Sequence, residues 1–210
     1  MQQIILASGS PRRKEILELL GLTFEVAESL YDEDLIQTDD PVELVEELAL
    51  QKALAVAKRY PDALIIGGDT TVTFGSGWIG KAETAEAARE MFAQLLGKTH
   101  TVVTGVVIVD SLTGQQYVGH EMGTVTFRAG TPEELDRYVA TEKNWRGFAG
   151  AYALQGAAAP FALSQGGKLS AIIGLPVELT AELLLQAGLE LDVDPKEVEE
   201  QLYGMKVGIS

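Results

Sequence analysis

Two arginines and a lysine, Arg12-Arg13-Lys14, lie where a helix is expected to begin. Ser10 is placed to cap that helix, and Pro11 suits its first position because proline has no N–H group to leave unpaired. Cations are mildly unfavourable in the first turn, which already carries the positive end of the helix dipole. Free backbone N–H groups and two guanidinium groups could instead bind a polyanion. The segment therefore predicts either a phosphate site or a solvated basic turn without a ligand.

A further lysine lies on the buried face of the next expected helix. Asp40-Pro41 begins this helix, which runs to about Arg59. Its apolar residues form a stripe at helical spacing, and Lys52 falls at the centre of that stripe. A lysine in this position either snorkels to the edge of the buried face or reaches a buried anion.

Two acidic residues and one more lysine occupy comparable positions. Asp69 follows the apolar strand expected at 63–67, and open α/β sheets place their ligand chemistry at the carboxyl ends of buried strands. Lys81 follows a hairpin expected at 72–79. Glu33 lies in an acidic stretch, which is either a solvated loop or a source of carboxylate for a hard cation.

Together these residues have the composition that phosphoryl transfer requires: cations to offset developing charge, acids to hold a metal, and a base to orient water. The residues concerned are Arg12, Arg13, Lys52, Lys81, Glu33 and Asp69. Serine–histidine hydrolysis is poorly supported, because His100 and His120 accompany no nucleophile elbow and are expected to be structural. A Walker loop is absent, since no glycine-rich turn ends in Gly-Lys-Ser or Gly-Lys-Thr.

The composition narrows the class of protein. A chain of 210 residues with 46% apolar residues is long enough for one large α/β domain or two small lobes. The absence of cysteine excludes disulfides, thiolate metal sites and a thiol nucleophile. The net charge of −15 would repel nucleic acids and anionic membranes, so a phosphorylated substrate needs locally converging cations. No apolar run suits a membrane span and no signal-peptide pattern is present, so a cytoplasmic location is expected.

Strand and helix patterns alternate before a run of strands, which predicts an α/β fold with a mixed sheet. Gly119 and Gly123 interrupt the strand expected at 117–127 and suggest a bulge or a bend. Two more strands are expected at 161–164 and 169–173.

The chain closely resembles the Maf (septum-formation-inhibitor-like) nucleoside triphosphate pyrophosphatases over roughly residues 3 to 188. The resemblance rests on an ordered set of short motifs. They are Leu6-Ala7-Ser8-Gly9-Ser10-Pro11-Arg12-Arg13-Lys14-Glu15, Gly68-Asp69-Thr70, Gly80-Lys81, Gly97-Lys98-Thr99-His100, Ala149-Gly150-Ala151-Tyr152 with Gln155-Gly156, and Gly174-Leu175-Pro176.

This resemblance implies hydrolysis of a nucleoside triphosphate to the monophosphate and pyrophosphate with a divalent cation, Mg²⁺ or Mn²⁺. It implies a mixed, twisted central sheet flanked by helices, like that of inosine triphosphate pyrophosphatases, with a cleft between two lobes. Residues 1–190 would form this domain, and 191–210 would form a peripheral helical tail. A homodimer is implied, and no nucleic-acid or membrane partner is expected.

Carried over by position, Asp69 looks like the general base on the attacking water, and it would share the metal with Glu33. Arg13, Lys52 and Lys81 would hold the triphosphate, with Lys52 and Lys81 acting as catalytic cations. The implied substrate-binding residues are Ser8, Arg12, Arg13, Thr70 and Gln155.

Three of these positions track the nucleotide base in subgroups of the family. Arg12, Thr70 and Gln155 form a combination similar to that of the dTTP/UTP subgroup, whereas the 7-methyl-GTP subgroup carries tryptophan in place of Arg12. The chain departs from the family pattern twice. Gly80-Lys81-Ala82 stands for the usual Gly-Lys-Pro, and Gly147-Phe148 stands for the usual Asp-Lys before Ala-Gly.

The sequence thus predicts a pyrophosphatase for dTTP and UTP, and for modified pyrimidine nucleotides, in which an Asp69-activated water attacks the α-phosphate. Two alternatives remain open. A nucleotidyltransferase would use a sugar phosphate in place of water, and a nucleotide-binding regulator of cell division would bind nucleotide with little turnover.

Overall fold

The computed structural model describes residues 2–75 and 77–205. Within these residues, seven strands form one sheet in the order β2-β1-β3-β5-β6-β7, and β4 pairs with β3 off this path. The strands are β1 (Gln3–Leu6), β2 (Glu25–Val26), β3 (Ala63–Phe74), β4 (Gly77–Ile79), β5 (Thr99–Asp110), β6 (Gln116–Phe127) and β7 (Ala162–Gly166).

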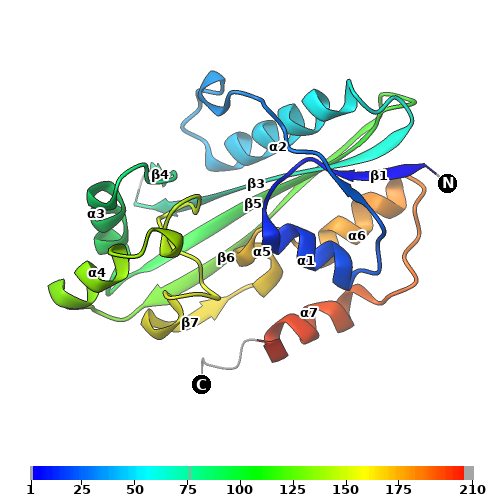
Figure 1. Cartoon of the computed structure of the whole chain (residues 1–210). Coiled ribbons are helices and arrows are strands. Elements are labelled where there is room, and N and C mark those ends of the chain that lie inside the picture. The colour runs from blue at the N-terminus through cyan, green and yellow to red at the C-terminus, as the bar shows by residue number, and fades with distance from the viewer. Residues whose placement is uncertain (1, 76, 206–210) are drawn as a thin grey trace.

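The sheet is mixed. Strand β1 pairs in parallel with β2 and β3, whereas β3, β5, β6 and β7 pair successively antiparallel. The three central strands β3, β5 and β6 are each 12 residues long and extend through both halves of the molecule (Figure 1). The predicted α/β class with a mixed sheet is therefore confirmed. The predicted hairpin at 72–79 is present as β3–β4, and Ser76 at its turn lies outside the described residues.

Helices cover both faces of this sheet. Helix α2 lies on one face, while α1, α5, α6 and α7 lie on the other at the same end of the molecule, and α3 and α4 lie at the opposite end (Figure 1). The helices are α1 (Pro11–Leu19), α2 (Pro41–Ala57), α3 (Ala85–Leu95), α4 (Pro132–Val139), α5 (Leu169–Ile173), α6 (Val177–Gln186) and α7 (Pro195–Met205). Among the described residues, no helix has both the length and the apolar character that crossing a bilayer requires.

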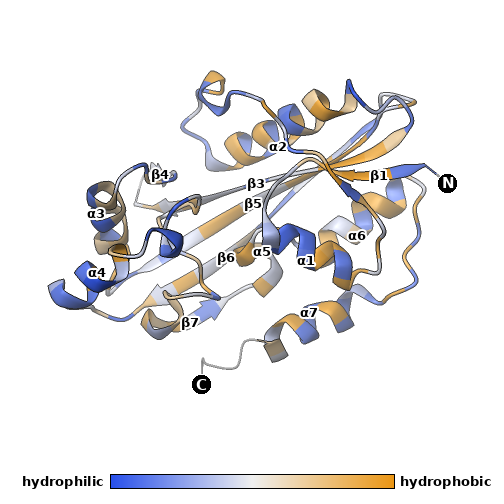
Figure 2. Ribbon diagram, in the orientation of Figure 1, coloured by the Kyte–Doolittle hydropathy of each residue, from blue (hydrophilic) through white to orange (hydrophobic). Residues whose placement is uncertain are grey.

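Helix α2 forms as the sequence predicts and lies unusually close to the sheet. Asp40 Oδ1 caps it by accepting from Val42 N at 2.8 Å, and its buried residues are apolar except for Lys52. The ribbon of α2 in Figure 2 accordingly carries much of the hydrophobic colour. A Cβ atom on Gly67 of β3 would lie 2.2 Å from Ala49 O, and one on Gly105 of β5 would lie 2.5 Å from Val45 O. Only glycine at these two strand positions allows the helix backbone to come so near.

Two other strand glycines serve the opposite face. Strand β6 pairs with β5 without a register change from Gln116 to Thr126, so of the predicted bulge or bend at Gly119 and Gly123 the bulge is wrong. A Cβ on Gly119 would lie 2.9 Å from Leu179 of α6, and one on Gly123 would lie 2.5 Å from Ile172 of α5. These glycines make room for packed helices rather than distorting the strand.

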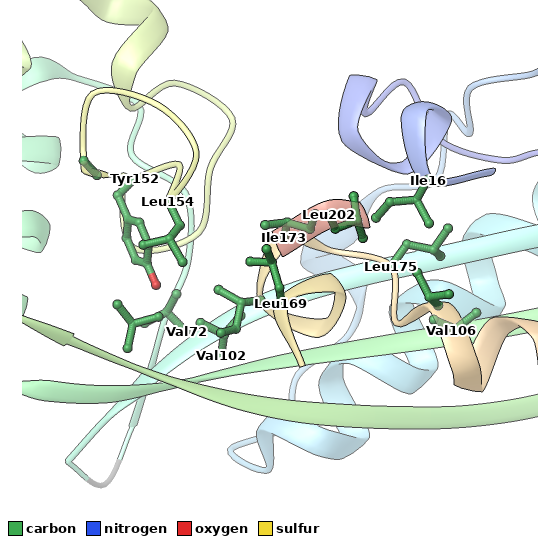
Figure 3. Close-up of a cluster of buried hydrophobic side chains, with 14 of the residues drawn as sticks. Ile16, Val72, Val102, Val106, Tyr152, Leu154, Leu169, Ile173, Leu175 and Leu202 are labelled. Carbon is green, nitrogen blue, oxygen red and sulfur yellow. The ribbon is translucent and has the colours of Figure 1, made fainter. Parts of the chain in front are cut away.

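The segment Leu169–Ile173, predicted as a strand, is the short helix α5. All five of its residues are buried, and a short apolar run buried on every side has no period that separates helix from strand. Gly174, at φ +113°, ends the helix in the left-handed region. The side chains of α5 join the two halves of one core. Figure 3 shows Leu169 and Ile173 between Val102 and Tyr152 on one side and Ile16 and Leu202 on the other.

An aromatic cluster fills the half of the molecule that carries α3 and α4. It comprises Phe92, Phe127, Tyr138, Tyr152, Phe161 and His100. His100 is 2% exposed, and its Nε2 lies 2.7 Å from the Tyr152 hydroxyl. Burial lowers the pKa of His100 from its usual 6.5 to about 4, so the imidazole is neutral at pH 7.

This burial predicts a specific acid sensitivity. The unfolded chain binds the His100 proton below pH 6.5, but the folded chain binds it only near pH 4. The contribution of the neutral imidazole to the free energy of unfolding is therefore fully present above pH 6.5 and is lost as the pH falls toward 4. The loss is about 3 kcal/mol, since each unit of pKa difference corresponds to about 1.4 kcal/mol. We expect His100→Gln, which can still meet the Tyr152 hydroxyl, to remove this part of the loss. Urea unfolding at several pH values from 7 to 4 measures the free energy of unfolding. If this free energy fell equally steeply with pH in the variant and in wild type, the expectation would be contradicted.

Candidate active site

Most of the predicted site residues gather around one hollow of about 590 Å³. Its walls come from the β1–α1 turn, the segment before α2, helix α2, strand β3, Lys81, and the segments 146–154 and 172–174. The predicted residues that line it are Ser8, Arg12, Arg13, Glu33, Lys52, Asp69, Thr70 and Lys81. Gln155 is exposed and is not among the lining residues.

Lys52 connects the two acidic residues of the hollow. Its Nζ lies 2.6 Å from Asp69 Oδ1 and 2.7 Å from Glu33 Oε1. Lys52 is 9% exposed and Asp69 is 6% exposed, so the lysine does not snorkel to the edge of its helix but reaches a buried anion. The glycines that bring α2 onto β3 and β5 make this contact possible, because they set the helix within reach of the strand.

A second lysine completes the ion-pair cluster. Lys81 Nζ lies 2.9 Å from Glu33 Oε2. Burial alone would raise the pKa of Glu33, but the hydrogen bonds and charges of Lys52 and Lys81 outweigh it and lower this pKa to about 2. Glu33 is therefore fully ionised at neutral pH.

Arg13 crosses the hollow from α1 and bonds only to neutral oxygens. Its Nε donates to Gly174 O at 2.8 Å, Nη1 donates to Ser8 Oγ at 2.9 Å, and Nη2 donates to Thr70 Oγ1 at 3.2 Å. Burial lowers the pKa of Arg13, and the charges of Asp69 and Glu33 oppose this effect. A buried guanidinium fixed in this way, without a carboxylate bonded to it, is suited to an anionic ligand.

The start of α1 is also open to an anion. Ser10 is at the N-cap position, as predicted, but its side chain does not make the expected capping hydrogen bond. Ser8 Oγ instead accepts from Ser10 N at 3.3 Å while it accepts from Arg13. Within the described part of the chain, the backbone N–H groups of Arg12 and Arg13 have no hydrogen-bond partner. Free first-turn N–H groups are the usual phosphate donors at a helix N-terminus.

Arg12 lies against an aromatic ring. Its guanidinium carbon is 4.4 Å from the centroid of the Phe148 ring, and its buried Nε has no hydrogen-bond partner among the described residues. Burial and then the neighbouring charge of Arg13 lower the pKa of Arg12 to about 10. The Arg12 guanidinium is therefore held by a cation–π contact with Phe148 and keeps donors for a ligand.

The sequence matches the family model Maf, described as Maf-like protein, over residues 3–187. The chain belongs to the Maf family. The dTTP/UTP pyrophosphatase of Desulforamulus reducens is 42% identical over 191 residues, 91% of this chain and 100% of that protein. Proteins of the same name from Pelotomaculum thermopropionicum and Symbiobacterium thermophilum are 43% and 42% identical over 188 residues, 90% of this chain and 98% and 95% of theirs. A solved HAM1 protein from Coxiella burnetii has a TM-score of 0.41 and 17% identity over 60% of this chain and 73% of that one.

The motifs that resemble the Maf family do not all meet in the hollow. Thr70 does, and its hydroxyl lies 3.0 Å from Thr104 Oγ1, which donates to Ala171 O at 2.7 Å. Because the single Thr104 proton is used there, Thr70 donates to Thr104 and accepts from Arg13. Gln155, by contrast, lies outside the lining of the hollow in this Maf chain.

Three residues of this Maf site were not predicted from sequence. Thr104 orients Thr70 from the neighbouring strand, Phe148 stacks on Arg12, and Ser170 anchors the Gly174 turn. The alternation of side chains along β5 could have assigned Thr104 to one face of the sheet, but no local sequence pattern identifies Thr70 as its hydrogen-bond partner. Phe148 is visible only as a departure from the family motif.

Two acidic residues of the hollow, Glu33 and Asp69, are of the donor type that a hard divalent cation prefers. Within residues 2–75 and 77–205, no three histidine or acidic side chains form a metal-binding group. Mg²⁺ commonly uses only one or two carboxylates together with waters and substrate phosphates. Glu33 and Asp69 match that donor set, and Asp69 Oδ2 makes no hydrogen bond to any described residue.

Proposed function

We propose that this Maf-family chain hydrolyses dTTP and UTP, together with modified pyrimidine nucleotides, to the monophosphate and pyrophosphate. The observation that carries the proposal is the placement of Asp69, paired with Lys52, in the same hollow as the Arg13 guanidinium, which bonds only to neutral oxygens. The relatives' shared name supports the choice of dTTP and UTP.

In the proposed reaction, water attacks the α-phosphorus in line with the bond to the β-phosphate oxygen. Asp69 accepts the proton of this water, the new P–O bond forms, and pyrophosphate leaves with the electrons of the broken bond. Lys52 holds the Asp69 carboxylate through Oδ1 and leaves Oδ2 for the water. Arg13 and the first-turn N–H groups of α1 bind phosphate oxygens, and Lys81 offsets their charge.

A divalent cation held by Glu33 and Asp69 would supply further charge neutralisation on the phosphates. Lys52 pairs with Glu33 Oε1 and Asp69 Oδ1, and Lys81 pairs with Glu33 Oε2, so the cation would share the Glu33 oxygens with these two lysines. The identity of this cation, Mg²⁺ or Mn²⁺, is part of the proposal.

The direct test is pyrophosphate release from a panel of nucleotides that includes dTTP, UTP, purine triphosphates and 7-methyl-GTP, with Mg²⁺, with Mn²⁺ and with chelator. Turnover of dTTP and UTP with water alone supports the proposal. Release only in the presence of a sugar phosphate would instead identify a nucleotidyltransferase. Tight binding by calorimetry without turnover would identify a nucleotide-binding regulator.

Phe148 offers a test of how Arg12 is positioned. We expect Phe148→Leu, which keeps apolar volume but removes the ring face, to raise KM for dTTP about fivefold, since a cation–π contact contributes about 1 kcal/mol. Because Phe148 touches no group assigned to proton transfer, kcat should change little. Steady-state kinetics give both constants, and Phe148→Tyr, which retains the ring, is the matched control. A KM for Phe148→Leu equal to that of the control would show that the contact is dispensable.

The homodimer and the cytoplasmic location also belong to this proposal. The homodimer is implied by the resemblance to the Maf pyrophosphatases, whereas the cytoplasmic location is the expectation drawn from the composition of the sequence. Two apolar side chains of β6, Val118 and Met122, are more than two-fifths exposed on one face of the strand and are compatible with a second copy. Light scattering on the purified chain measures the oligomeric state.

A further inference from the structure

The last helix carries a buried acidic residue that the proposed reaction does not use. Helix α7 follows the segment matched by the family model, which ends at residue 187. Val198 and Leu202 of α7 are buried in the main core, and Glu199 between them is 7% exposed. Figure 3 shows Leu202 beside Ile16 and Ile173. A glutamate in this setting needs a hydrogen-bond partner to offset the cost of its burial.

The partner of Glu199 is the backbone of α5. Ser170 N donates to Glu199 Oε1 at 3.1 Å. Ser170 is completely buried, and Lys168 at the N-cap position of α5 supplies no side-chain capping bond. The Glu199 carboxylate therefore satisfies a buried N–H group that would otherwise be left unpaired.

Ser170 in turn fixes the turn that follows α5. Its carbonyl oxygen accepts from Gly174 N at 3.1 Å and from Leu175 N at 3.0 Å, and its hydroxyl accepts from Val177 N at 3.0 Å. Two oxygen atoms of Ser170, through three hydrogen bonds, thus hold the backbone from Gly174 to Val177. Any shift of Ser170 moves this turn as a unit.

The turn ends at the substrate hollow. Gly174 O accepts from Arg13 Nε at 2.8 Å, and a Cβ on Gly174 would lie 3.3 Å from Thr70 Oγ1. Gly174 therefore packs closely against Thr70 and Arg13. A single intermediate residue, Ser170, connects the carboxylate of α7 with the carbonyl that orients Arg13.

We propose that Glu199 is a positioning residue for Arg13, and that α7 is thereby a working part of the phosphate-binding site. Without the Glu199 carboxylate, Ser170 must move to pair its N–H group, and Gly174 O moves with it. Arg13 then loses the acceptor that fixes its Nε edge, although Glu199 itself touches no substrate. The kinetic part of this inference rests on the proposed pyrophosphatase function.

The first experiment compares three variants of the full chain. Glu199→Met removes the acceptor at similar volume, Glu199→Gln keeps an oxygen for Ser170 N, and Val198→Ala damages the packing of α7 but leaves Glu199 in place. We expect Glu199→Met to raise KM for dTTP at least about fivefold, as loss of an orienting contact commonly does. Glu199→Gln and Val198→Ala should stay within about twofold of wild type. Equal effects of Glu199→Met and Val198→Ala at matched loss of Tm would overturn the inference.

A double-variant cycle tests the route through Arg13. Arg13→Lys has no Nε–H group to donate to Gly174 O, so adding Glu199→Met to it should have almost no further effect on kcat/KM. Multiplicative losses would mean that Glu199 acts by another route and would refute the inference.

A spectroscopic measurement separates this inference from the proposed function. In the nitrogen-15 spectrum of the ligand-free protein, the Arg13 Nε–H signal should exchange slowly with water in wild type and in Glu199→Gln. It should shift and exchange faster in Glu199→Met. An unchanged Arg13 signal in Glu199→Met would overturn the positioning role, whereas absent dTTP and UTP turnover with the expected change in this signal would overturn only the proposed function.

Discussion

Asp69→Asn is expected to reduce pyrophosphate release from dTTP and UTP by about 10²- to 10⁴-fold, the usual contribution of a positioned general base. The amide has the volume of the carboxylate but cannot accept the water proton at neutral pH. Lys52 keeps its second partner Glu33 at 2.7 Å, so the fold should survive the change. Loss of turnover with little loss of nucleotide binding would then locate the defect in the chemical step.

Asp136→Asn provides the matched control for this variant. Asp136 is an exposed aspartate on α4 that pairs with Arg89 and does not line the hollow. Its replacement changes the net charge by the same amount and should leave activity within about twofold of wild type, since exposed ion pairs contribute little. If Asp69→Asn retained more than about a tenth of wild-type turnover, Asp69 would not be the general base.

Lys52→Met is expected to have the second largest effect, because it damages both stability and activity. The variant removes the cation between Glu33 and Asp69 and leaves the buried Asp69 carboxylate unpaired. Such losses destabilise proteins by about 3 kcal/mol. Activity should fall at least about 10²-fold, since Asp69 loses its orientation and the phosphates lose a neighbouring cation.

Urea unfolding and pyrophosphate release measure the two effects of Lys52→Met separately. Lys58→Met, at the exposed end of the same helix, is the control, and it should change neither quantity appreciably. A Lys52→Met protein as stable as this control would indicate that the ion-pair cluster contributes nothing to the folded state. Wild-type turnover by Lys52→Met would remove Lys52 from the proposed mechanism.

The sequence was most informative where local rules and burial agree. Asp40-Pro41 and the apolar stripe that follows it predict α2 together with its cap. For Lys52 the stripe established a buried position but not a partner. The choice between snorkelling and an ion pair depended on how near α2 approaches β3, and that distance is set by glycines on two strands far apart in the chain.

The predictions that failed share one physical cause, which is that tertiary contacts replaced a local preference. Ser10 has the right position for a cap, but the side chain that bonds to this turn is that of Ser8. The Ser8 hydroxyl accepts from both Ser10 N and Arg13 Nη1. Gly119 and Gly123 accommodate helices instead of a bulge. In the connection from Glu199 through Ser170 to Arg13, the last contact joins Gly174 to Arg13, which lie 161 positions apart in the sequence. No local sequence pattern reveals such a contact.

The continuity of β3, β5 and β6 through both halves of the molecule has a consequence for how the protein unfolds. Strand β3 shares ten consecutive register positions with β5, from Leu64 opposite Asp110 to Thr73 opposite Thr101. Neither half has a sheet of its own, so neither can open without breaking hydrogen bonds that the other needs. The aromatic cluster near α3 and the ion pairs near α2 therefore belong to one cooperative unit. Damage at one end lowers the energy needed to open the other.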